Sequence, residues 1–207
     1  MSTRDKLLRA TQEALVADGI AGLSARTVAA RAGVNQALVF YHFGTVSELA
    51  AAAATALCEE SVAHYREQFA AVDSLTALLA LGEVVHAREQ QTGNVAVMAQ
   101  LMAGAQRDPV LAAAGRAAMD LWRAEVESVV RRVLAPSPVA DVVDADGLAR
   151  AISAAFIGLE LYEGVDPDGA AAALAALERL GVLLEAVDDL GPVARRAVRA
   201  RLRRVRR

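Results

Sequence analysis

The chain has 207 residues, of which 55% are apolar and 4% aromatic, and its formal net charge is −3. This length and apolar content suit a small domain joined to a larger body with a substantial core. A weakly acidic protein cannot rely on bulk attraction to DNA, and the single Cys58 excludes an internal disulfide framework. Alanine and leucine dominate and the alternation typical of strands is not seen, which predicts an all-α fold.

The first fifty residues predict three short helices. Apolar residues at helical spacing, Leu7, Ala10, Ala14 and Leu15, indicate a first helix that ends at Gly19. Ser24 is an N-cap residue for a second helix with Val28, Ala29 and Ala32 on its apolar side, and Gly33 can adopt the left-handed backbone that ends it.

A third helix is predicted from Gln36 to Phe43, with Asn35 as its cap. Val39 and Phe43 point inward in this pattern, which leaves Gln36, Ala37, Phe40 and Tyr41 outward. Two helices joined by a tight turn, with aromatic residues facing outward, are typical of a DNA-reading helix-turn-helix. The alternative is an ordinary helical hairpin.

The spacing of residues over all three helices resembles the tetracycline-repressor (TetR) family of bacterial transcription regulators. The residues that carry the resemblance are Gly19, Ala29, Ala32, Gly33, Val34, Tyr41, His42 and Phe43. It implies an N-terminal DNA-binding domain, residues 1–45, a helical ligand-binding and dimerisation domain, residues 46–190, and a basic tail, residues 191–207. Two positions depart from the family pattern: Phe40 stands where Tyr or His is common, and Val46 where Lys is common.

This reading assigns each exposed residue of the module a contact with double-stranded DNA. Gln36 and Ala37 are expected at base edges, and Phe40 and Tyr41 against the sugar-phosphate wall or a thymine methyl group. Phosphate contacts are expected from Ser24, Arg26, Thr27, Asn35 and His42.

Helical patterns separated by Gly and Pro continue through the rest of the chain. Thr45 and Glu48 are predicted to form a capping box at the start of the first of these helices. The predicted helices span residues 46–71, 75–91, 95–106, 110–134, 145–163 and 168–188. In the tail, residues 195–207 hold eight arginines and no acid, whereas residues 51–194 carry a net charge of −12. The tail is interpreted as a solvated terminal helix or a frayed end, with a second nucleic-acid contact or anionic lipid as alternatives.

The two long helices at 145–163 and 168–188 match the family's dimer-forming helices, so a homodimer is expected. The interface residues predicted there are Ile152, Phe156, Leu159, Leu174, Leu177 and Leu184. The alternative is that these helices only complete an intramolecular core.

The family resemblance also implies a pocket for a small effector in the middle helices. Larger or polar residues in this alanine-rich region are the candidates for its lining, and they predict an apolar or aromatic compound: His64, Phe69, His86, Met98, Met102 and Trp122. Core packing is the alternative for each of them. The predicted function is a ligand-responsive regulator, more specifically a repressor that binds a palindromic operator.

No pattern of a catalytic site, metal site or phosphate loop occurs in the sequence, so neither an enzyme nor a cofactor is expected. The alanine-rich runs are too short to cross a bilayer and the N-terminus lacks a signal peptide, which together predict a cytoplasmic protein with no membrane partner. The competing hypothesis is a helical binding protein or enzyme whose N-terminal hairpin is structural.

Overall fold

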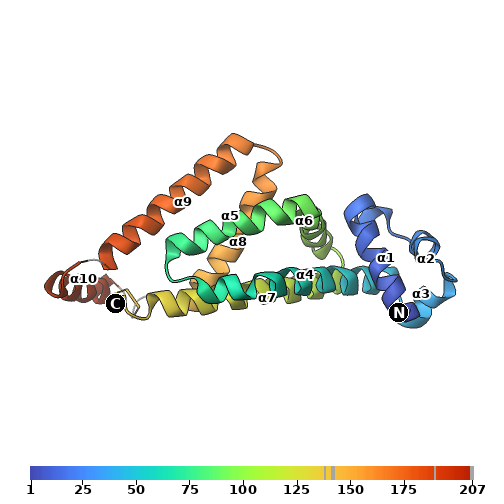
Figure 1. Ribbon diagram of the computed structural model, residues 1–207, viewed down its shortest axis with the longest axis horizontal. Helices are drawn as coiled ribbons and strands as arrows, with labels where there is room; N and C mark the ends of the chain where they lie inside the picture. The colour runs from blue at the N-terminus through green and yellow to red at the C-terminus, as the bar shows by residue number, and fades with distance from the viewer. Residues whose placement is uncertain (138, 141–142, 189, 206–207) are drawn as a thin grey trace. The chain divides into compact units, whose positions relative to one another are not determined.

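A computed structural model describes residues 1–137, 139–140, 143–188 and 190–205, and this part of the chain contains helices and turns but no strand (Figure 1). The helices in chain order are α1 (Thr3–Asp18), the 3-10 turn η1 (Ile20–Gly22), α2 (Ala25–Ala32), α3 (Ala37–Phe43), α4 (Val46–Ala71), α5 (Leu75–Thr92), α6 (Asn94–Ala105), α7 (Pro109–Leu134), α8 (Ala145–Glu163), α9 (Pro167–Asp188) and α10 (Pro192–Val205). The all-α prediction is confirmed.

The chain divides into two compact units. The first unit contains Met1–His64 and His86–Leu121, and the second contains Tyr65–Val85 and Trp122–Arg207. Helices α4, α5 and α7 each supply residues to both. The predicted boundaries between the functional domains, after residues 45 and 190, stay a prediction.

Helices α1, α2 and α3 form a small head with its own core. Seven buried residues make up this core, and Phe43, Val34 and Ala32 pack against them from the surface: Leu7, Ala10, Ala25, Val28, Ala29, Val39 and Leu49. The core residues of α1 and of α2 recur at helical spacing, α3 adds Val39, and Leu49 comes from the first turns of the following helix, so one buried face per helix packs the head together with the start of α4.

The turn between α2 and α3 follows the chemistry expected of its residues. The Ser24 hydroxyl accepts a hydrogen bond from the Thr27 amide at 3.1 Å, and Gly33 adopts φ 66° and ψ 36° after α2. Asn35 Oδ1 accepts from the Ala37 amide at 2.8 Å, while Gln36 already has helical angles just before α3. The predicted caps at Ser24 and Asn35 are therefore confirmed, and α3 begins one residue after the expected Gln36.

The start of α4 differs from a full capping box. The Thr45 hydroxyl accepts from the Glu48 amide at 3.0 Å, as predicted. The Glu48 carboxylate accepts from the same hydroxyl at 2.9 Å, whereas the Thr45 amide donates to the Phe43 carbonyl. The threonine caps the helix, and the second half of the box is replaced by a side-chain pair.

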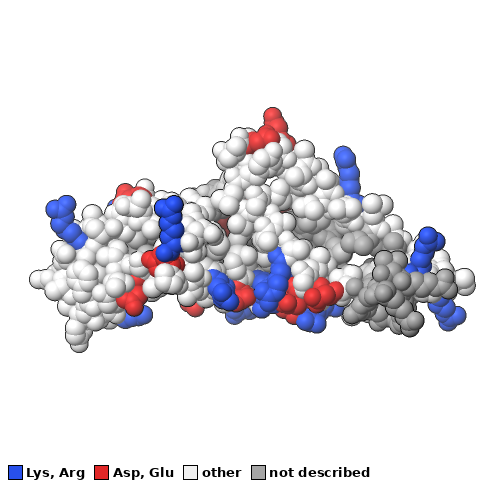
Figure 2. Space-filling model, turned by 180° about the vertical axis from the view of Figure 1, so that it is seen from behind, with Lys and Arg blue, Asp and Glu red and all other residues white. Residues whose placement is uncertain are grey.

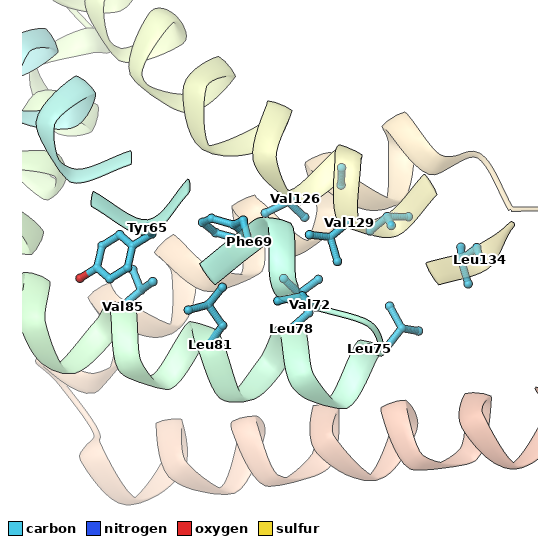
Figure 3. Packing of buried hydrophobic residues seen from close by; sticks show 12 residues of the cluster. Tyr65, Phe69, Val72, Leu75, Leu78, Leu81, Val85, Val126, Val129 and Leu134 are labelled. Atoms are coloured by element: carbon cyan, nitrogen blue, oxygen red, sulfur yellow. The ribbon is translucent and has the colours of Figure 1, made fainter. Parts of the chain in front are cut away.

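The second unit has a core drawn from four helices (Figure 3). The end of α4 supplies Tyr65 and Phe69, Val72 lies in the segment between α4 and α5, and α5 and α7 supply Leu and Val residues to the same cluster. Arg132 of α7 donates to the carbonyls of Phe69 at 2.8 Å and Val72 at 2.7 Å, which ties α7 to the end of α4 and the segment after it. Helix α8 closes the cluster with Ala149.

The predicted bounds of the helices from residue 46 onward agree with the structure to within one residue at each end. This accuracy follows from clear breakers such as Asp108-Pro109 and Asp166-Pro167, which stop or start a helix wherever they occur. The tail is helical through Val205, as expected for a terminal helix, and its role stays a prediction. Residues 206 and 207 lie outside the described part.

Within the described residues no single helix is long and apolar enough to cross a membrane. The bent pair α3 with α4 meets the length and composition test when its two helices are taken together.

Candidate nucleic-acid interface

Helix α3 presents an exposed face of mixed polar and aromatic character. Tyr41 is 81% exposed and Phe40 is 49% exposed, although both are large apolar side chains that a monomer normally buries. Gln36 and Ala37 are also exposed, at the start of the same helix. Val39, on the opposite side, is completely buried, so the helix has one anchored and one free face.

The residues predicted to contact phosphates surround this face. Arg26, Thr27 and Asn35 are exposed, and Ser24 and His42 are half-buried. The Ser24 and Thr27 hydroxyls lie 3.0 Å apart, and the Thr27 oxygen also accepts from the Ser24 amide at 3.0 Å. These two hydroxyls therefore cap α2, and a contact with phosphate would be made by groups already fixed in place.

Aromatic and cationic contacts hold the end of α3. The Tyr41 and His42 rings meet edge to face with centroids 5.0 Å apart. The Arg4 guanidinium lies 5.2 Å from the centroid of the Phe43 ring. This cation–π contact brings a positive charge from α1 to the end of α3. Sequence reasoning did not single out Arg4, because a lone arginine in the first turn of a helix has no recognisable signal.

The charges of the head are arranged unevenly. Arg31, which follows the exposed side of α2, is paired with Asp18 at 3.1 Å. Figure 2 shows basic side chains that stand apart from one another, with acidic side chains between them, on the face that it presents. Attraction to DNA would therefore come from a few placed cations, in agreement with a net charge of +1 over residues 1–50.

The residues predicted to line an effector pocket do not all fall in one unit. His64, His86, Met98 and Met102 belong to the first unit, and Phe69 and Trp122 to the second. Phe69 is 5% exposed in the core cluster, and its ring centroid lies 6.3 Å from that of the half-buried Trp122, so packing already accounts for this pair. His64 is exposed, whereas His86, Met98 and Met102 are half-buried. The pocket stays a prediction.

Helices α8 and α9 pack on each other and form a hairpin (Figure 1). Of the residues predicted for a dimer interface, Ile152 and Phe156 pack against the core cluster of their own chain. Leu159, Leu174 and Leu177 are half-buried, and the side chain of Leu184 lies outside the described residues. The hairpin also exposes large apolar residues that were not among the predicted interface residues: Leu161, Tyr162, Val165, Leu180, Val182 and Leu183.

The turn between these helices is fixed by Asp166. Its carboxylate accepts from the Gly169 amide at 3.0 Å and from the Tyr162 hydroxyl at 2.8 Å. The amide bond first and the hydroxyl bond second hold the pKa of Asp166 below its ordinary value, and the pKa of the Tyr162 hydroxyl is raised by the same contact with Asp166. Among the described residues no group of three or more His, Cys, Asp or Glu could hold a metal ion.

A short helix capped at both ends, with one side anchored in a small core and the other exposed, defines a helix-turn-helix DNA-binding module. The model of the tetR family of bacterial regulatory proteins matches residues 7–53, which contain this module. Comparison with curated protein sequences gave no match.

Solved structures extend the likeness beyond the head. A structure described as a TetR-family transcriptional regulator from a Rhodococcus species has a TM-score of 0.69 at 23% identity and covers 86% of this chain and 98% of its own. GusR from Salmonella enterica has a TM-score of 0.67 at 20% identity, with 88% and 95% covered. The multidrug binding protein EbrR, complexed with proflavin, has a TM-score of 0.61 at 26% identity, with 86% and 99% covered.

The N-terminal module therefore matches the tetR family of bacterial regulatory proteins over residues 7–53, and the helical fold of most of the chain is shared with solved structures of such regulators.

Proposed function

We propose that the protein is a homodimeric repressor that acts in the cytoplasm, binds a palindromic operator through α3, and is released by a small apolar or aromatic effector. The observation that supports operator binding best is the exposure of Tyr41 and Phe40 beside the exposed Gln36 and Ala37. Gln36 can form paired hydrogen bonds with adenine in the major groove, and Ala37 can contact a thymine methyl group.

The remaining contacts in this proposal are made to the DNA backbone. Phe40 has no donor group and packs on sugar or a thymine methyl group, while the Tyr41 hydroxyl supplies the phosphate hydrogen bond that Phe40 cannot make. Ser24, Arg26, Thr27, Asn35 and His42 fix the register through phosphates, and Arg4 adds a cation at the end of α3.

The dimer is proposed on the exposed face of the α8–α9 hairpin. On α9 the exposed residues Ala172, Ala176, Leu180 and Leu183 recur every three or four positions, so they share one side of the helix. Small residues at the first two positions permit close approach of a second helix, and Leu183, at 62% exposed, supplies apolar area. A two-fold axis through such a face would bury it against its own copy.

Ligand response is proposed from the likeness to EbrR, a protein named for multidrug binding and solved with proflavin, a flat aromatic compound. The half-buried Met98 and Met102 suit this class of effector, because thioether side chains adapt to apolar and aromatic surfaces.

A footprinting experiment on DNA beside the protein's own coding region tests the proposal. The expected result is protection of two related half-sites whose centres lie about one helical turn apart, roughly 34–36 Å. Binding that is equal for this DNA and for random DNA would refute operator recognition. Transcription that rises when the gene is deleted supports a repressor, and transcription that falls would show an activator instead.

A further inference from the structure

The end of α1 is held directly by α6 within the first unit. Gln100 Oε1, on α6, accepts a hydrogen bond from the Ile20 amide at 2.6 Å, across 80 residues of sequence. Ile20 begins η1, the turn that connects α1 to the helix-turn-helix. The Gln100 side chain of α6 is therefore hydrogen-bonded to the backbone of the head at the point where α1 ends.

Two glycines make this contact close. Gly19 has φ 71°, which favours glycine, and a Cβ atom there would lie 2.4 Å from Gln100 Oε1, so a larger residue would displace the Gln100 side chain from the Ile20 amide. At the other end of the contact, a Cβ atom on Gly93 would lie 2.7 Å from a methyl group of Val16. Gly93 is the N-cap of α6, and Gln100 lies about two turns along the helix. Contacts at two points along α6 fix the direction of α1 as well as its position.

Helix α6 is also tied to α4 and α5 within the same unit. Val97 and Leu101 are buried, and the Asn94 amide donates to the carboxylate of Glu89 at 2.7 Å and to the Ser61 hydroxyl at 3.2 Å. Ser61 lies on α4 and Glu89 on α5, and the Ser61 hydroxyl also donates to Glu89 at 2.7 Å. A partly buried polar network of three hydrogen bonds therefore joins α6 to both α4 and α5.

A second hydrogen bond joins the start of α4 to the turn that follows α6. The Ser47 hydroxyl donates to Asp108 Oδ2 at 2.7 Å, while Asp108 Oδ1 accepts from the Val110 amide at 2.8 Å. Asp108 thus caps α7 and restrains the first turn of α4 at the same time. The head is linked to the α6–α7 segment on both sides, through Ile20 before the helix-turn-helix and through Ser47 after it.

We propose that Gln100 is a positioning residue for DNA binding: its hydrogen bond to Ile20 sets the direction of the head and, with it, the direction of α3. The inference rests on the proposed function, in which two heads must match two half-sites. A head that tilts freely can still bind one half-site. It cannot bind both at once without the cost of restoring the correct direction.

The first test compares three variants on two DNA probes. Gln100→Met keeps the length of the side chain and removes the acceptor, Gln100→Glu keeps an accepting oxygen, and Gln106→Met is the matched control at the exposed end of α6. The probes are the palindrome selected by the wild-type protein and the same DNA with one half-site scrambled. Loss of one hydrogen bond predicts that Gln100→Met reduces the preference for the intact palindrome by about tenfold, while Gln100→Glu and Gln106→Met keep it.

The second test needs no operator. Hydrogen exchange of the full-length protein should be faster in Gln100→Met than in Gln106→Met at the amides of Ile20 and Gly22, and at the start of α3. A merely structural role would lower affinity for both probes equally and speed exchange throughout the first unit. Equal losses on the two probes, a defective Gln100→Glu, or unchanged exchange at Ile20 would each overturn the inference. If the wild-type protein selects no palindrome, but hydrogen exchange at Ile20 is still faster in Gln100→Met than in Gln106→Met, the proposed function alone would be refuted.

Discussion

Val39 and Tyr41 are two residues apart in α3 and have opposite environments, which makes them a matched pair for mutation. Val39 is completely buried with Leu7, Val28 and Leu49, whereas Tyr41 is 81% exposed. Val39→Ala removes two methyl groups worth about 0.8 kcal/mol each, and the cavity that remains raises the loss of unfolding free energy to about 2–3 kcal/mol. Tyr41→Ala removes an exposed ring that packs edge to face with His42, so we expect the free energy of unfolding to fall by less than about 0.5 kcal/mol.

The two variants should rank in the opposite order for operator binding. Tyr41→Ala should weaken operator binding by about tenfold without loss of stability, because one hydrogen bond and one apolar contact with the DNA wall disappear. Val39→Ala should bind normally wherever the head is folded, so its defect should vanish on cooling or at low denaturant. Urea unfolding and fluorescence anisotropy with labelled operator, on the same preparations, give both quantities.

The account would be refuted if Tyr41→Ala lost stability and Val39→Ala lost operator affinity instead. A Tyr41→Ala protein that loses more than about 1.5 kcal/mol of stability would mean that Tyr41 belongs to the core, since an exposed side chain cannot contribute this much. A Tyr41→Ala protein with unchanged stability and unchanged operator affinity would remove Tyr41 from the interface.

Three further predictions follow from single contacts. Gly33→Ala should cost about 1–2 kcal/mol in urea unfolding, from the left-handed backbone alone, because a Cβ atom there would meet nothing within 4 Å; a neutral result would show that the turn relaxes. Hydrogen bonds from the Ser47 hydroxyl and then the Val110 amide hold the pKa of Asp108 below its ordinary value. The charged form therefore adds stability above about pH 4, and the advantage of wild type over Asp108→Asn in thermal unfolding should shrink as the pH falls below this; a constant difference would contradict it. Leu183→Arg should give monomers in light scattering, whereas Val84→Arg, at a similarly exposed apolar position on α5, should not, and dimers in both would exclude the α9 face.

The head and the helix bounds could be predicted from the sequence because their signals are local. Ser24, Gly33 and Asn35 act on neighbours within three residues, so their chemistry fixes the turn wherever it occurs. The exposed face of α3 followed from the same periodicity that buries Val39.

The contacts between distant segments could not be predicted. The hydrogen bond from Ile20 to Gln100 spans 80 residues and involves a polar side chain with no periodic pattern. Similarly, helical spacing showed which residues of α8 are apolar but not which partner they face. Ile152 and Phe156 were therefore predicted for a dimer surface, and in the structure they pack against the core of their own chain. The direction that an apolar stripe faces depends on tertiary packing, which no local signal contains.

The most direct test of the central claim, that the exposed face of α3 reads base sequence, is a set of affinities for the operator and for each of its single base-pair variants. These should be measured with the wild-type protein and with Gln36→Ala at one salt concentration. The account predicts that Gln36→Ala loses about 1–3 kcal/mol of discrimination at one base pair in each half-site and keeps the wild-type affinity for random DNA. Discrimination that survives at every base pair, or an equal loss on operator and random DNA, would contradict it.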